Sequence, residues 1–156
     1  MSLREGGCDV NAAEAEEIVS KGLTALDNGH THLALVCFER AFEIERDPLV
    51  CSSLGFCLAA VRGEVAEGIA LCREAIEKEE ANTIHYRNLG RVLLLDGQKD
   101  EALKVFRQGM RVGRDGGIIR ELEALGARKP PVVPALRRDH FLNKWLGIIL
   151  ERLGFR

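Results

Sequence analysis

The sequence predicts an all-α solenoid built from three helix pairs, and three observations carry this prediction. Gly29, Gly63 and Gly97 stand 34 residues apart. The residues around each glycine repeat in the same register, with a small residue and then a large one following at fixed distances. Between the glycines, apolar residues recur with helical spacing. A period of 34 residues with two helical halves is typical of a helix-turn-helix repeat array.

Length and composition fit one soluble globular domain. The 156 residues are 46% apolar and 29% charged, with a net charge of −2. No apolar run reaches the roughly 18 residues of a membrane span, and the N-terminus lacks the pattern of a signal peptide. Five cysteines, an odd number without a CxxC pair, predict reduced and packed thiols in a cytoplasmic protein.

The net charge hides an uneven distribution of charged residues. Residues 1–80 have a balance of −9, and residues 81–156 have a balance of +7. This asymmetry is consistent with polar head-to-tail contacts or one charged binding end, and equally with an uneven solvated surface. Because aromatic residues make up only 5% of the chain and its net charge is slightly negative, nucleic-acid binding is not expected.

The first two predicted repeats span residues 11–47 and 48–81, after a tail of residues 1–10. In each repeat an apolar helical stripe ends at a turn glycine, and a second stripe follows the turn. Asp47-Pro48 marks the boundary between them. Aspartate accepts hydrogen bonds from free amide groups at a helix start, and proline is favoured at the first helical position.

The third predicted repeat spans residues 82–114 and opens at Asn82, a second capping side chain. It resembles the tetratricopeptide repeat family, whose pattern is W-x2-L-G-x2-Y, then A-x3-F, then proline. The positions that correspond to this pattern are Tyr86, Leu89, Gly90, Leu93, Ala102 and Phe106.

The other two repeats match the family pattern less fully. The first keeps the glycine and the final phenylalanine, at Gly22 and Phe38. The second departs most, because its glycine stands one place early at Gly55 and Cys72 replaces the phenylalanine. None of the three keeps the closing proline. Three matches in register over residues 11–114 imply the α-solenoid fold, in which neighbouring pairs bury one another's apolar faces.

Three further segments follow the repeats. Residues 115–127 are predicted to form a short amphipathic helix, where a fourth repeat would place its first helix. Residues 128–138 are a Pro-rich connector, which is either a stiff linker or a ligand for an aromatic-lined groove. Residues 139–156 are predicted to form a final helix that is apolar around much of its circumference.

The final helix must bury its apolar surface against something. It either caps the open end of the solenoid or forms a self-association or partner-docking surface, most simply in a homodimer. Membrane-surface binding is a third and less favoured alternative, suggested by flanking basic residues. The residues assigned to the capping or self-association surface are Phe141, Trp145, Ile148 and Ile149.

The sequence carries no catalytic motif. It holds no phosphate-binding loop, no HExxH and no nucleophile elbow. His30 and His32 lie near a turn with Asp27 nearby, but a metal site would need more ligands, and surface histidines are common. We therefore predict a protein that is not an enzyme and has no cofactor and no metal.

The resemblance implies that the first helix of each pair lines an inner groove that holds a peptide. The best-known version grips the terminal carboxylates of a chaperone tail with Lys, Arg and Asn. Of the matching positions only Asn88 fits, because Val19, Leu23, Leu54 and Ile84 are apolar, so this binding mode is not expected. The residues predicted to line the groove are Val50, Ser53, Leu54, Cys57, Val61, Arg87, Asn88 and Arg91.

Arg87 and Arg91 give this predicted groove a basic end, because they stand one helical turn apart on one face. An apolar stripe with a cationic end suits an amphipathic segment that carries an acidic group. The predicted function is protein–protein interaction, as a scaffold or adaptor that binds a protein or peptide. The alternative is a regulatory subunit that works as a homo-oligomer through its final helix.

Overall fold

The computed structural model describes residues 6–126, with side chains from Ala13 onward. The connector of residues 128–138 and the final helix of residues 139–156 lie outside the described residues. The capping or self-association surface predicted there therefore stays a prediction. The described residues up to Leu122 belong to one compact unit, which contains the helix pairs.

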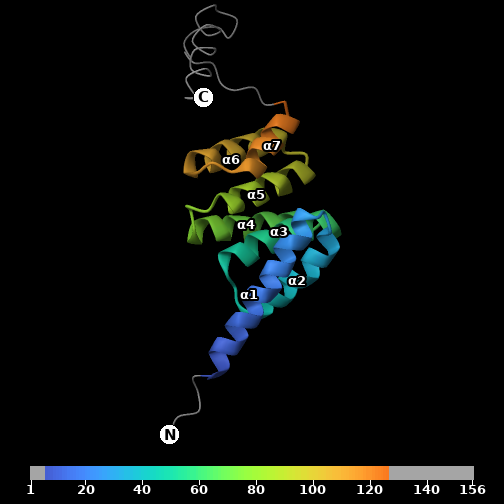
Figure 1. The fold of residues 1–156 in the computed structure, drawn as a ribbon. Coiled ribbons are helices and arrows are strands. Elements are labelled where there is room, and N and C mark those ends of the chain that lie inside the picture. The colour runs from blue at the N-terminus through green and yellow to red at the C-terminus, as the bar shows by residue number, and fades with distance from the viewer. Residues whose placement is uncertain (1–5, 127–156) are drawn as a thin grey trace, which may run out of the picture. The chain divides into compact units, whose positions relative to one another are not determined.

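The described residues form seven α-helices and no strand, as the all-α prediction requires. Six helices pack as three antiparallel pairs, each stacked on the next, and a shorter helix follows them (Figure 1). The pairs are α1 (Gly6–Asp27) with α2 (Thr31–Ile44), α3 (Pro48–Arg62) with α4 (Val65–Lys78), and α5 (Thr83–Leu95) with α6 (Lys99–Val112), and the seventh helix is α7 (Gly116–Ala124).

The turn within each pair falls at the predicted glycine. Gly29, Gly63 and Gly97 have φ angles of 77°, 74° and 76°, in the left-handed region that side chains with a Cβ rarely adopt. A residue in this conformation ends a helix and lets the next amide bond back to an orphan carbonyl. The 34-residue spacing of the glycines thus records three equivalent turns.

The starts of α3 and α5 use the predicted caps. Asp47 Oδ1 accepts hydrogen bonds from the amide of Leu49 at 2.8 Å and from the amide of Val50 at 3.4 Å. Asn82 Oδ1 accepts one from the amide of Ile84 at 3.1 Å. Both side chains satisfy amides that the first helical turn leaves without an intrahelical partner.

The start of α1 differs from the sequence prediction. The helix begins at Gly6, five residues before the repeat was expected to begin at position 11. Alanine and glutamate are strong helix formers, and a run of them precedes Ile18. This run supports the start of the predicted repeat, and residues 6–10 extend the helix by five residues beyond it.

Large residues of the second helix in a pair fill notches in the first helix. Phe38 of α2 and Phe106 of α6 have no exposed surface. A methyl group placed on Gly22 would come within 2.9 Å of the Phe38 ring, and one placed on Gly90 would overlap the Phe106 ring. The two rings therefore occupy the space left by the missing side chains, and both phenylalanines are buried as predicted.

The middle pair is held together differently. Gly55 of α3 faces Gly68 of α4, and a methyl group on either would come within 2.7 Å or 2.5 Å of the other's carbonyl oxygen. Cys72 is fully buried, and its thiol donates to the Ser52 carbonyl at 3.4 Å. The second repeat therefore replaces an aromatic ring in a notch with a close approach of two backbones.

Candidate functional site

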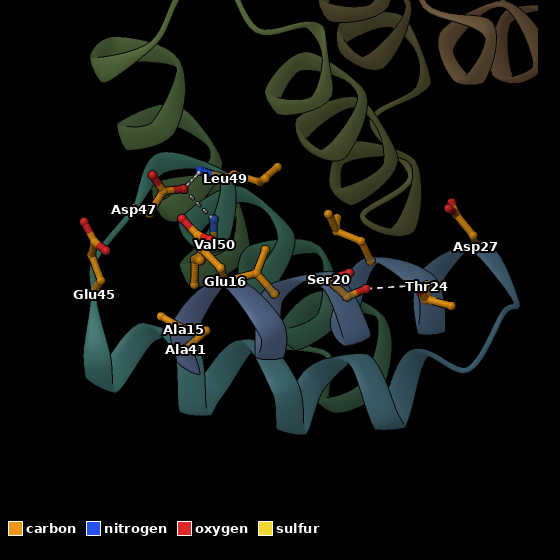
Figure 2. A pocket seen from close by; sticks show the side chains of 12 residues that line it. Ala15, Glu16, Ser20, Thr24, Asp27, Ala41, Glu45, Asp47, Leu49 and Val50 are labelled. Atoms are coloured by element: carbon orange, nitrogen blue, oxygen red, sulfur yellow. Dashed lines mark hydrogen bonds between the residues drawn. The ribbon is translucent and has the colours of Figure 1, made fainter. Parts of the chain in front are cut away.

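An open pocket of about 630 Å³ lies along α1, beside the end of α2 and the start of α3 (Figure 2). The α1 residues that line the pocket recur every three or four residues, about one helical turn, so they form one stripe along the helix. Ala41 of α2 closes one side, and Leu49 and Val50 of α3 close another. The residues that α1 contributes are Ala15, Glu16, Val19, Ser20, Leu23, Thr24 and Asp27.

The floor of this pocket is apolar. Val19 and Leu23 are half-buried and pack against the hydrophobic core between the first two helix pairs. Val50 is buried and Leu49 is half-buried beside them. An occupant with an apolar side would therefore remove aliphatic surface from water on both partners, which is the main favourable term in most protein association.

The rim of the pocket is acidic. All four ionisable lining residues are carboxylates, namely Glu16, Asp27, Glu45 and Asp47. Figure 2 shows Glu45 and Asp47 at the end of the pocket where α1 carries Glu16, while Asp27 stands at the opposite end. Asp47 caps α3, and the other three side chains make no ion pair among residues 13–126.

The basic residues of α1, α2 and the loop after α2 form ion pairs with carboxylates that do not line the pocket. Lys21 pairs with Glu17 at 2.7 Å, and Arg40 pairs with Glu14. Arg46 lies over the ring of Phe42 and pairs with Glu74 at 2.8 Å. None of these three cations lines the pocket, so the four carboxylates are its only charged lining residues among the residues that the structure describes.

The structure brings one residue of the predicted groove to this pocket. Val50 lines it, whereas Leu54 and Cys57 belong to the core and Val61 packs against that core. Ser53 is fully buried, and its hydroxyl makes no hydrogen bond within the described part of the chain. Four of the five residues that the sequence assigned to the groove on α3 therefore lie in or against the core, because the sequence pattern did not separate core positions from surface positions.

Asn88 belongs to a buried polar network rather than to an open surface. Its side-chain nitrogen donates to Ser52 Oγ at 3.3 Å. Ser52 Oγ lies 2.8 Å from His85 Nδ1, and His85 Nε2 lies 3.0 Å from a carboxylate oxygen of Glu79. The network joins α3 to α5 and satisfies the buried histidine at both ring nitrogens. The sequence does not reveal this network, because its partners stand 33 and 36 positions apart and form no motif along the chain.

The order Ser52, His85, Glu79 matches the residue types of a nucleophile, base and orienting acid, but the surroundings do not suit catalysis. Ser52 and His85 have no exposed surface. A substrate carbonyl could therefore not reach the hydroxyl without separating α3 from α5. The network accordingly stabilises the packing of these two helices.

The two predicted groove arginines are paired with the segment that follows the repeats. Arg87 Nη1 lies 3.3 Å from Asp115 Oδ1, and Arg91 Nε lies 2.7 Å from Glu121 Oε1. Arg91 also lies over the ring of Phe56, 5.4 Å from its centre. The basic end that the sequence indicates thus meets two carboxylates of the same chain.

Asp115 is held at the start of α7 by several groups. Its Oδ1 accepts from the Ile118 amide at 2.9 Å, and its Oδ2 accepts from the Thr83 hydroxyl at 3.1 Å. Burial by itself would raise the pKa of Asp115, but the Ile118 amide, the charge of Arg87 and the Thr83 hydroxyl together hold that pKa below its ordinary value. The ionised carboxylate therefore fixes α7 against α5.

Two other kinds of site, a metal site at the histidines and a membrane-spanning helix, find no support in the described residues. His30 and His32 are exposed, and residues 13–126 bring no three His, Cys, Asp or Glu side chains together as a metal site would need. None of the seven described helices is long and apolar enough to cross a membrane.

Comparisons with known proteins point to one fold. No protein-family model matches the chain, and no curated protein matches it in sequence. The first tetratricopeptide domain of Spaghetti (RPAP3), bound to the HSP90 peptide SRMEEVD, is similar in structure, with a TM-score of 0.56 at 16% identity over 72% of this chain and 90% of that one. The Sgt2 tetratricopeptide domain from Aspergillus fumigatus gives 0.56 at 16% identity, over 81% and 92%.

A third solved domain of this kind is the second tetratricopeptide domain of human RPAP3 in complex with the HSP70 peptide SGPTIEEVD. It has a TM-score of 0.57 at 15% identity, over 78% of this chain and all of that one. These similarities show the fold, and seven helices in the described residues fit about three repeats of this kind. The chain has the fold of the tetratricopeptide repeat domain, an α-solenoid of three helix pairs followed by a further helix.

Proposed function

We propose that this chain is a non-catalytic interaction module that holds a segment of a partner protein in the pocket between α1 and the start of α3. The observation that carries the proposal is this pocket, with its aliphatic floor and its acidic rim, three of whose four carboxylates make no ion pair among residues 13–126. Its volume of about 630 Å³ falls within the range of sites that enclose a small ligand or a few side chains.

Two structurally similar domains support the proposal, because one is bound to the HSP90 peptide SRMEEVD and the other is in complex with the HSP70 peptide SGPTIEEVD. A fold of this kind can therefore hold a short peptide. The chain is not expected to hold those same acidic peptides at α1, because Val19 and Leu23 offer no positive charge and the rim is acidic. The choice of partner follows from this chain's own surface.

The predicted role of Arg87 and Arg91 in binding an acidic group stays a prediction. A partner carboxylate at this place would compete with Asp115 and Glu121, which already occupy the two guanidinium groups. The alternative function, a regulatory homo-oligomer formed through the final helix, concerns residues 139–156, which lie outside the described residues.

Photo-crosslinking of the full chain in its native cells tests the proposal. A benzoyl-phenylalanine at Ser20, an exposed residue of the pocket, should give a discrete adduct with a partner protein. The matched control carries the same group at Val36, which is 62% exposed on α2 and does not line the pocket. Adducts at Val36 but not at Ser20 would move the interface to another face and reject the proposal.

A further inference from the structure

The charge and shape of the pocket define the chemistry of its occupant. We infer that it binds a basic amphipathic segment, with an apolar side against Val19, Leu23 and Leu49 and with Lys or Arg side chains toward the acidic rim. The inference rests on the proposed function, since it names the class of partner for that same pocket. The charge of this basic segment is opposite to that of the acidic segment that the sequence alone predicts.

The rim supplies the first argument. Glu16 and Glu45 both line the pocket toward the same end, and both are exposed and without an ion pair in the described part of the chain. Asp47 adds a third carboxylate at the same end. Each exposed carboxylate interacts only weakly with a single cation, but like charges that converge on one site raise the local potential together. A partner with basic side chains at that end is favoured, and an acidic partner is repelled.

The length of the apolar stripe supplies the second argument. From Ala15 to Asp27 the α1 axis rises about 18 Å, at 1.5 Å per residue. That length matches about three helical turns of a bound segment, with apolar side chains spaced three and four apart. Asp27 at the far end offers a fourth carboxylate, so a second basic side chain is favoured there.

The experiment uses the full chain and two synthetic fluorescent peptides of about 14 residues, which is roughly the number of helical residues needed to span the stripe. One peptide has leucines on one helical face and lysines on the other, and its counterpart has glutamate in place of every lysine. Fluorescence anisotropy measures affinity, and amide chemical shifts locate the binding site. The lysine peptide should bind at least about tenfold more tightly and shift the amides of Val19, Leu23 and Val50.

Two double variants separate local from overall charge. Glu16→Lys with Glu45→Lys reverses the rim and should weaken the lysine peptide by at least about tenfold. The matched control, Glu43→Lys with Glu80→Lys, makes the same change of net charge at exposed positions outside the pocket, and it should weaken binding less than about threefold. Circular dichroism of both variants checks that they remain folded.

Equal losses in the two double variants would show attraction to overall charge and would overturn the inference. Tighter binding of the glutamate peptide with shifts at Val19 and Leu23 would also overturn it, yet would leave the proposed partner pocket standing. Failure of both peptides to shift these amides would overturn the inference as well. In that case the crosslinking experiment at Ser20 still tests, independently of the peptides, whether a partner protein lies in the pocket.

Discussion

Phe106 packs into the place on α5 where Gly90 has no side chain. A methyl group at that glycine would overlap the ring, which is itself fully buried. The same relationship holds between Phe38 and Gly22 in the first pair. The small and the large residue of each repeat are therefore in direct contact. The effect on stability of replacing one of them should depend on which residue stands at the other position.

Gly90→Ala should lower the free energy of unfolding by about 1–3 kcal/mol, because overpacking outweighs the helix propensity that alanine gains. Urea denaturation measures the change. Gly116→Ala is the matched control, since the nearest atom outside the local backbone lies 3.9 Å from the added methyl group. If the two variants are equally stable, the notch does not restrict the residue at position 90.

Phe106→Ala should lower the free energy of unfolding by about 3–5 kcal/mol, as large-to-small changes in a core do. Phe106→Leu, added to Gly90→Ala, should recover part of the stability that Gly90→Ala loses, because the smaller side chain relieves the overlap with the methyl group at position 90. A double-mutant cycle gives the coupling between the two positions. Additive effects would contradict the direct contact.

Cys72→Phe should destabilise the chain even though it restores the family pattern. Cys72 is fully buried beside the close approach of Gly55 and Gly68, where there is no notch for a ring. We expect a loss of about 1–3 kcal/mol by urea denaturation, as overpacked cores show. Cys72→Ala provides the control for loss of the thiol. A more stable Cys72→Phe variant would show that the middle pair packs like its neighbours.

The buried cysteines should react slowly with iodoacetamide. Burial raises the pKa of Cys57 to about 12, and burial also raises the pKa of Cys72. At pH 8 a thiol with a pKa near 12 is ionised in only about one molecule in ten thousand. Mass spectrometry of the native chain should therefore find half-buried Cys37 modified at least about tenfold faster than Cys57. Equal rates in native buffer would contradict this packing.

The attachment of α7 should weaken in acid. The pKa of Asp115 is lower in the folded chain, so its contribution to stability is fully present above its ordinary value near 3.8 and is lost as the pH falls through the folded value. The protection factors of the α7 amides, which are exchange rates corrected for the intrinsic effect of pH, should therefore fall more than those of α5 below about pH 4. In Asp115→Asn this difference between the helices should shrink. An unchanged acid response in that variant would assign the effect to another carboxylate.

The sequence predicted the turns, the caps and the buried phenylalanines because each depends on local spacing. Gly29 ends one helix, and Asp47 starts another, through contacts within a few residues along the chain. The contacts of Arg91 with Glu121 and of Ser52 with His85 join residues 30 and 33 positions apart, and a single sequence carries no signal for such pairs. The acidic pocket was missed for the same reason, since α1 and the start of α3 contribute to it together.

The claim that a partner segment lies in the pocket between α1 and α3 is tested most directly by hydrogen exchange of the full chain with and without the partner captured at Ser20. We predict slower exchange in residues 15–27 of α1 and in the first turn of α3, with little change in α6. Protection confined to α6, or no protection at either helix, would contradict the account.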